Sequence, residues 1–274
     1  MIIPFGYFLC HGCTNHTLFP QEGFSIKHIA YNWDMEPEIA QKLVALNHQF
    51  YQSFAIEFSE TRGRLQPGVV TVLNRLDLGV SILDLGCGNG EIASQLDEMN
   101  FKGTYLGTDF SHALLEEASH RYQGRFPAQF LTLDLIQPDW SGSLPGRTFD
   151  LIFCFAVLHH IPGKEQRAAI CHKIHNYLPR GGKVYLSNWQ FLKSERLKTR
   201  ILPWKTVDLN PDQVEEGDYL LDWRRGGQGI RYVHHFNPEE LENLAGESGF
   251  RLLESFHSDG KEGNLSLYQV WEAL

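Results

Sequence analysis

The sequence is poor in cysteine and in long apolar runs. Its five cysteines are spread unevenly over 274 residues, which does not suggest a disulfide framework, so we expect a reducing, cytoplasmic compartment. No apolar run approaches the roughly 20 residues that a membrane helix needs. The longest, Phe149 to Ile161, is interrupted by Asp150 and two histidines. The first Lys or Arg is Lys27, so we do not expect a secretory signal.

Basic charge is also scarce. The chain has 24 Lys and Arg against 33 Asp and Glu, a net charge of −9, which argues against a protein that coats DNA nonspecifically. Residues 190–231 differ, with eight basic and seven acidic residues. A local basic lip for a structured RNA is compatible with this distribution, and so is a solvated loop of mixed charge.

Signatures of metal and hydrolase chemistry are missing. The sequence contains no G-x-S-x-G elbow and no H-E-x-x-H motif. Cys10 and Cys13 suggest zinc, but the other three cysteines fall in expected core elements and supply no second ligand pair. We therefore predict no metal site. Residues 1–34 are predicted to be an N-terminal extension, with Met35 as a candidate functional start.

The remaining sequence, 35–274, predicts one α/β domain. Apolar residues at helical spacing over 38–58 indicate one or two helices, within an N-terminal helical lid at 35–66. Strands and helices then alternate, which implies a doubly wound, Rossmann-like parallel sheet. Residues 190–235 have weak periodicity and are expected to form an insertion, and the tail predicts an antiparallel hairpin. The expected strands are 80–85, 104–109, 129–133, 150–155, 183–188, 250–257 and 265–271, and the expected helices are 91–99, 113–122, 164–177 and 238–246.

A glycine-rich turn follows the first strand of this domain. Gly86, Gly88 and Gly90 lead into a helix, so the backbone there can turn sharply and approach a ligand. The dinucleotide fingerprint would place a third glycine at position 91, where Glu91 stands, and the GK[ST] of a P-loop is absent. A nucleoside ligand without phosphate, S-adenosylmethionine, fits better.

Three aspartates close the first three strands and suit that ligand. Asp84 would face the methionine ammonium, Asp109 would accept the two ribose hydroxyls, and Asp134 would reach the adenine amino group. We expect the cofactor site to include these aspartates, the glycines of the turn and the adjacent Cys87, Phe110 and Leu135.

This arrangement resembles the class I S-adenosylmethionine-dependent methyltransferases over residues 45–274. The segment from Phe149 to His160 is similar to the one that closes over the cofactor in that family, which adds Phe155 and Ala156 to the expected site. The resemblance implies a seven-stranded sheet whose one antiparallel strand comes from the C-terminal hairpin.

Three further stretches resemble the eukaryotic tRNA wobble-uridine methyltransferases, which esterify 5-carboxymethyluridine. They are Tyr51 to Arg62, Pro203-Trp204, and Arg231 to Phe236. The resemblance implies that Tyr51 and Arg62 hold the cofactor's carboxylate and that Arg231, Tyr232 and His234 lie near the acceptor. It also implies tRNA and a small activator protein as partners. At two places where that group has an aromatic residue, this chain has none, namely in Leu65-Gln66-Pro67 and in Asn264-Leu265.

The acceptor decides what chemistry the protein must add. A carboxylate is already ionised at neutral pH and needs only orientation, for which Arg231 is the leading candidate. A phenol or amine would require a base, and His159, beside His160, is the candidate. Trp189 and Trp204 are candidates to line the acceptor pocket. The alternatives are a methyltransferase for a small-molecule carboxylate or phenol and a catalytically silent cofactor-binding scaffold.

Overall fold

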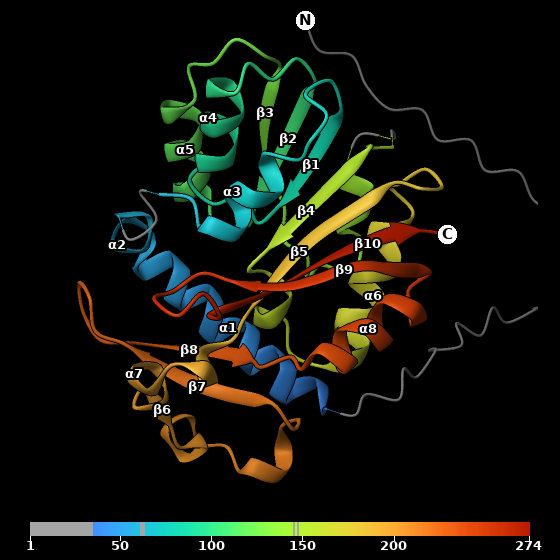
Figure 1. Ribbon diagram of the computed structural model, residues 1–274. Coiled ribbons are helices and arrows are strands. Elements are labelled where there is room, and N and C mark those ends of the chain that lie inside the picture. Colours follow the sequence, from blue (N-terminus) through green and yellow to red (C-terminus); the bar gives the residue numbers. More distant parts are fainter. Residues whose placement is uncertain (1–34, 61–63, 145, 147) are drawn as a thin grey trace, which may run out of the picture. The chain divides into compact units, whose positions relative to one another are not determined.

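The computed structural model describes residues 35–60, 64–144, 146 and 148–274 of the chain. Seven strands form one sheet in the order β3-β2-β1-β4-β5-β10-β9 (Figure 1). Strands β1 to β5 pair in parallel, whereas β10 runs antiparallel to both of its neighbours. This confirms the predicted Rossmann-like sheet with a C-terminal hairpin. The strands are β1 Ser81–Leu85, β2 Thr104–Asp109, β3 Ala128–Thr132, β4 Leu151–Phe155, β5 Lys183–Trp189, β9 Phe250–Ser258 and β10 Ser266–Ala273.

The two faces of the sheet bury separate apolar clusters, because alternate residues of a strand point to opposite sides. Ile82 and Phe153 pack with helices α3 and α4, whereas Leu83 and Ile152 pack with α6 and α8. Figure 1 shows α4 and α5 on one side of the sheet and α6 and α8 on the other. These helices are α3 Pro67–Leu73, α4 Glu91–Glu98, α5 His112–Arg121, α6 Lys164–His175 and α8 Pro238–Glu247.

Local sequence signals set two of the helix starts. The hydroxyl of Ser111 accepts the Leu114 amide at 3.4 Å, so α5 begins at the predicted N-cap. The side chain of Asn237 accepts the Glu240 amide at 2.9 Å, and Pro238 occupies the first turn of α8.

The predicted helical stretch 38–58 forms two helices, α1 Pro37–Ser53 and α2 Ala55–Glu60. The α1 helix packs against β8 (Gly229–His234) of a second sheet, where Leu43 joins Leu220 and Tyr232 in one buried cluster. The lid function of residues 35–66 stays a prediction, and the predicted extension 1–34 lies outside the described residues.

The expected insertion folds as a small antiparallel sheet, with strand order β6-β7-β8. Its strands carry buried apolar residues on both faces, since Leu220 packs toward α1 and Leu221 toward Phe191. These strands therefore lack the alternation of apolar and polar residues that is typical of half-exposed strands. For this reason the sequence pattern did not predict them. The elements are α7 Glu195–Lys198, β6 Ile201–Leu202, β7 Asp218–Trp223 and β8 Gly229–His234, with short 3-10 turns η3 Phe191–Lys193, η4 Trp204–Val207 and η5 Pro211–Gln213.

The carboxyl ends of β1, β2, β4 and β5 meet at one edge of the large sheet, where the 3-10 turn η2 Leu158–His160 follows β4. A further 3-10 turn, η1, spans Trp140–Ser143. Among the described residues, no helix is both long and apolar enough to cross a membrane.

Candidate cofactor and acceptor site

The glycine-rich turn closes the end of β1 and is tied to β2. The amides of Gly86 and Cys87 donate to the Thr108 carbonyl at 2.7 and 2.9 Å. Gly88 has φ +55°, and a Cβ added there would project into open space, whereas one at Gly86 would meet Val157 at 2.4 Å. The turn thus leaves room for a ligand at Gly88, as the predicted cofactor requires. Gly90 faces away from that space, since its added Cβ would meet Ala118 at 2.8 Å.

Two buried carboxyl groups lie at the ends of β1 and β2. Asp84 is 1% exposed and accepts a hydrogen bond from the Tyr105 hydroxyl at 2.5 Å. Burial raises the pKa of Asp84 to about 7, against the effect of that hydrogen bond and with a further contribution from the charge of Asp109. A buried carboxylate of this kind suits a ligand ammonium, because a positive partner favours its ionised form.

The carboxyl group of Asp109 is oriented by the backbone. The amides of Gly88 and Ser111 donate to its two oxygens at 3.0 and 2.8 Å. Burial nevertheless raises the pKa of Asp109 to about 6. Because a carboxylate offers about four acceptor positions, this group retains capacity for two ribose hydroxyls.

Asp134 follows β3 and lies beside a stacked aromatic pair. The rings of His48 and Phe110 stack with centroids 4.6 Å apart, and His48 Nε2 lies 3.5 Å from the Asp134 carboxylate. Burial alone would raise the pKa of Asp134, but hydrogen bonds from His48 and from the Ile136 amide outweigh it, so this pKa lies below its usual value. The planar His48–Phe110 pair suits an adenine, and His48 was not predicted from the sequence.

A cavity of about 670 Å³ joins these groups to the insertion. This volume is in the range typical of small-molecule sites. Gly90, Tyr232 and His234 do not line it, and Arg62 lies outside the described residues. The predicted residues that do line it are Tyr51, Asp84, Gly86, Cys87, Gly88, Asp109, Phe110, Asp134, Leu135, Phe155, Ala156, His159, Trp189 and Arg231.

Arg231 enters the cavity from β8 through a cluster of aromatic rings. Its guanidinium carbon lies 4.7 Å from the ring centroid of Trp189, 5.2 Å from that of Phe50 and 5.5 Å from that of Trp223. Arg231 is only 6% exposed. Aromatic rings stabilise the cation through their faces, while its N–H groups lie in the guanidinium plane and suit a planar anion. Trp204, by contrast, packs in the cluster under α1 and does not line the cavity.

The two histidines of η2 differ in their surroundings. His159 is 2% exposed, and its Nδ1 lies 3.3 Å from Asn188 Oδ1 and 3.4 Å from the Trp189 amide nitrogen. His160 contacts the Tyr51 hydroxyl and the Tyr232 carbonyl. His159 thus lines the cavity wall and is held in place by contacts with β5. Its role as a base stays a prediction.

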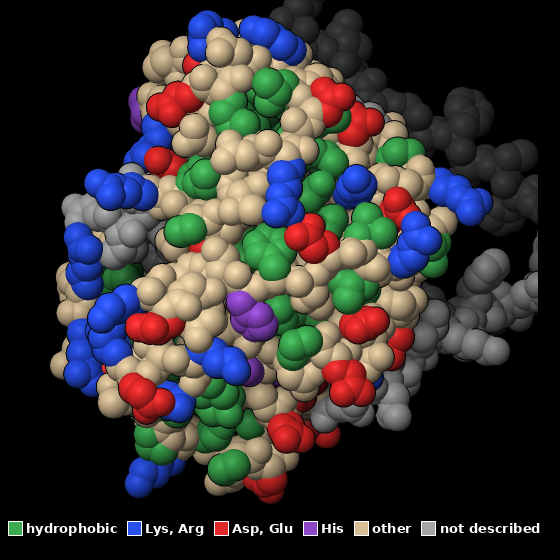
Figure 2. Space-filling view, in the orientation of Figure 1, with side chains coloured by type: hydrophobic (Ala, Val, Ile, Leu, Met, Phe, Trp, Pro, Cys, Tyr) green, Lys and Arg blue, Asp and Glu red, His purple; other side chains and the backbone are tan. Residues whose placement is uncertain are grey.

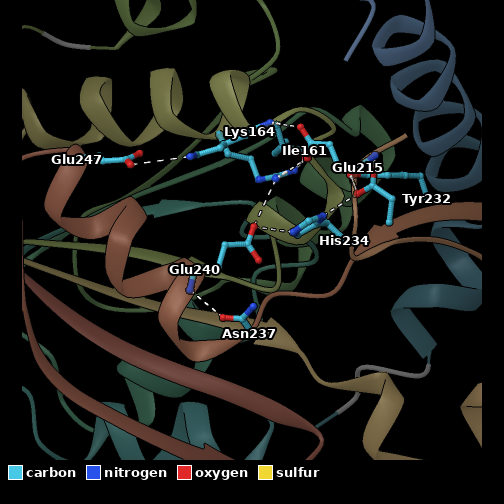
Figure 3. A network of polar contacts seen from close by, with 10 residues as sticks. Ile161, Lys164, Glu215, Tyr232, His234, Asn237, Glu240 and Glu247 are labelled. Carbon is cyan, nitrogen blue, oxygen red and sulfur yellow. Dashed lines mark hydrogen bonds and ion pairs between the residues drawn. The ribbon is translucent and has the colours of Figure 1, made fainter. Parts of the chain in front are cut away.

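Tyr232 and His234 belong to a buried polar network on the far side of β8 (Figure 3). The Tyr232 hydroxyl donates to Asp218 at 2.7 Å, and His234 bridges Asp218 at 2.7 Å and Glu240 at 2.8 Å. Residues two apart on a strand share a face, and Arg231 occupies the opposite face of β8. Tyr232 and His234 therefore lie outside the cavity, and their place near the acceptor stays a prediction.

The same network contains the one group of potential metal ligands found among the described residues. Ligand atoms of Glu215, Asp218 and His234 lie within 4.8 Å of one another. The Arg167 guanidinium already donates to Glu215 at 2.7 Å and is itself buried. Positive charge is thus supplied by the protein, and we infer no metal site there.

Comparisons with known proteins match the chain to methyltransferases. A family model described as a methyltransferase domain matches residues 83–184. The chain is 29% identical over 228 residues to a protein of Encephalitozoon cuniculi named as a methyltransferase, a match that covers 82% of this chain and 94% of that one. It is 31% identical over 182 residues to the tRNA (carboxymethyluridine(34)-5-O)-methyltransferase of Arabidopsis thaliana, covering 66% of this chain and 40% of the relative. The corresponding enzyme of Schizosaccharomyces pombe is 25% identical over 221 residues, with 76% and 89% covered.

Solved structures show the same fold. An S-adenosylmethionine-dependent methyltransferase of Methanosarcina mazei superposes with a TM-score of 0.58 at 23% identity, covering 77% of this chain and 98% of that one. Magnesium protoporphyrin IX methyltransferase of Synechocystis, with bound S-adenosylmethionine, gives 0.55 at 18% identity, with 85% and 97% covered. The sheet order, the matching methyltransferase domain and the relatives in sequence together show that the chain is an S-adenosylmethionine-dependent methyltransferase with a Rossmann-like fold.

Proposed function

We propose that this methyltransferase esterifies the carboxylate of a 5-carboxymethyluridine at the wobble position of a tRNA. The observation that carries the proposal is Arg231, a buried guanidinium that lines the cavity among three aromatic rings. A flat base with a carboxylate arm matches both features, because aromatic rings stack on bases and a guanidinium binds a carboxylate with two parallel hydrogen bonds. Several relatives in sequence are named as enzymes of this reaction.

The protein's own contribution is binding and alignment. When bound, S-adenosylmethionine would supply an electrophilic methyl group to an acceptor lone pair, and its sulfur would keep the electron pair of the broken bond. Asp84 and Asp109 would hold the cofactor's ammonium and ribose. Arg231 would hold the acceptor carboxylate, which is ionised at neutral pH and needs no base.

Further arginines on the cavity wall support a polyanionic acceptor. Figure 2 shows basic side chains gathered along the left side of the molecule, where Figure 1 places α7 and the loop after β7. Five arginines line the cavity in addition to Arg231, and we call them the arginine lip: Arg64, Arg196, Arg200, Arg224 and Arg225. A small-molecule carboxylate would use Arg231 alone, whereas an RNA also offers phosphates to the lip. The small activator protein implied by the sequence resemblance stays a prediction.

The test uses methyl-labelled S-adenosylmethionine and tRNA that carries 5-carboxymethyluridine. We expect label in the tRNA that mild base releases, as it does from an ester. Arg231→Ala should lower turnover at least about 100-fold, the scale of a lost charged hydrogen-bonding pair, and Arg231→Lys should restore little because it lacks the planar fork. The affinity for S-adenosylmethionine, measured by calorimetry, should change less than about twofold in both variants.

Arg251→Ala is the matched control, because Arg251 is an exposed arginine paired with Glu272 on the hairpin. Its turnover should equal that of the native chain. Label that enters only small molecules would overturn the tRNA proposal, and full turnover by Arg231→Ala would overturn the assigned role of Arg231.

A further inference from the structure

Tyr51 and His160 lie between the cofactor end of the cavity and its acceptor end. The Tyr51 ring packs edge-on against Phe110, with centroids 5.8 Å apart, and Phe110 directly follows Asp109. On the other side, the adjacent Phe50 lies under the guanidinium of Arg231. Both Tyr51 and His160 line the cavity. A methyl group that passes from cofactor to acceptor must cross this part of the cavity.

The hydrogen bonds of His160 determine which way the Tyr51 hydroxyl points. His160 Nδ1 lies 3.2 Å from the Tyr232 carbonyl oxygen, which can only accept, so Nδ1 carries the proton. In the neutral imidazole, Nε2 is then an acceptor. Since Tyr51 Oη lies 2.8 Å from Nε2, the Tyr51 hydroxyl donates to His160.

Asn47 holds this geometry in place. Its Nδ2 donates to the backbone carbonyls of His160 and Tyr232 at 3.1 and 3.2 Å, and its Oδ1 accepts the Tyr232 amide at 2.8 Å. Asn47 is buried, so these contacts are shielded from water. Helix α1, turn η2 and strand β8 are thereby joined at one point, and the carbonyl that orients His160 cannot turn away.

A phenol that donates its proton to His160 offers only oxygen lone pairs to any other neighbour. Those lone pairs attract positive charge and repel a carboxylate. We propose that Tyr51 faces the sulfonium and its methyl group, and that His160 is the positioning residue that turns the Tyr51 oxygen toward them. This replaces the predicted contact between Tyr51 and the cofactor's carboxylate. An oxygen fixed beside a sulfonium methyl attracts its polarised C–H bonds and needs no rearrangement during transfer.

The experiment compares the affinities for S-adenosylmethionine and S-adenosylhomocysteine, which share the ammonium, carboxylate and nucleoside but differ in the sulfonium methyl. Calorimetry gives both dissociation constants without turnover. Tyr51→Phe should weaken binding of S-adenosylmethionine about three- to fivefold, the scale of a C–H···O contact, and leave that of S-adenosylhomocysteine unchanged. An equal loss for the two ligands would overturn the proposal, since it would place Tyr51 on a group that they share.

Two substitutions separate positioning by His160 from mere packing. His160→Gln keeps an acceptor near Nε2 and should retain the native preference for S-adenosylmethionine, whereas His160→Leu should lose it as Tyr51→Phe does. A native preference in His160→Leu would overturn the role of His160. Tyr177→Phe, which removes a hydroxyl bonded to the Ser141 carbonyl outside the cavity, is the control. The inference rests on the proposed function for the place of the acceptor end at Arg231. Both dissociation constants are measured without an acceptor, so failure to find an ester and failure of this inference are distinguishable.

Discussion

At the scale of single residues, the site contains two carboxyl groups whose burial disfavours their ionised form. Asp84 and Asp109 have pKa values raised to about 7 and about 6 by burial. In an unfolded chain, an aspartate ionises near pH 4. Between about pH 4 and pH 7 the folded, ligand-free protein therefore holds more protons than the unfolded chain, and these groups make its stability fall as the pH rises.

A ligand that prefers the ionised carboxylates reverses this trend. We expect S-adenosylmethionine to bind more tightly at pH 8 than at pH 5.5, and to raise the melting temperature more at pH 8, because binding at the lower pH must first displace protons. Asp84→Asn should weaken binding at pH 8 by about 10-fold or more, the effect of losing a charged hydrogen bond, and should flatten the pH dependence.

Calorimetry and thermal melts at the two pH values check this prediction, with Asp139→Asn as an exposed control outside the cavity. Equal affinities at pH 5.5 and pH 8 would contradict the assignment of Asp84 and Asp109 to the cofactor.

At the scale of elements, the buried polar network connects the small sheet to helices that cover the large sheet. Arg167 on α6 donates to Glu215, which precedes β7, and His234 on β8 bridges Asp218 on β7 and Glu240 on α8. Burial alone would lower the pKa of His234, but its hydrogen bonds to Asp218 and Glu240 outweigh it and hold that pKa above its usual value. The stabilisation from His234 is therefore present at low pH and is lost as the pH rises through the raised pKa.

His234→Gln should destabilise the protein by about 1–3 kcal/mol, because it leaves buried polar partners without hydrogen bonds. The loss should be larger at pH 5.5 than at pH 8, as measured by urea unfolding at each pH. His172→Gln, on the exposed face of α6, serves as the matched control. A loss that grows with pH would show that His234 is held neutral in the folded protein.

At the scale of the whole molecule, the protein is acidic but its arginine lip lies on one cavity. The net charge is −9, yet all five residues of the arginine lip line the same cavity. A polyanion would be repelled by most of the surface and attracted there, so charge would orient an RNA on approach.

Removing part of this charge should weaken RNA binding without touching the cofactor. In the double variant Arg224→Ala/Arg225→Ala, we expect weaker tRNA binding. The slope of log affinity against log salt concentration should also become shallower by about 1 to 2. The affinity for S-adenosylmethionine should be unchanged. Filter binding at several salt concentrations measures this.

Lys102→Ala/Arg125→Ala is the control, since these exposed residues precede β2 and β3 at the opposite edge of the sheet. An unchanged salt slope in the lip variant would place the RNA elsewhere.

Local patterns were enough to predict the large sheet and the cofactor. The alternation of strands and helices, the glycines after Asp84 and the N-cap Ser111 are short-range signals, and a parallel sheet brings the ends of its strands to one edge wherever they stand in the chain. Asp84, Asp109 and Asp134 could therefore be assigned to one site, and the antiparallel β10 followed from the family resemblance.

Only the tertiary structure decided how the acceptor end is made. Helix α1 packs against β8, which brings Asn47 to Tyr232, and the same helix brings His48 to Asp134 at the cofactor end. These are long-range contacts that no local pattern encodes. Arg231 and Tyr232 are neighbours in sequence, but the strand turns one into the cavity and the other into the buried network. Which face of β8 lines the cavity depends on the packing of the whole insertion, and so that choice belongs to the fold.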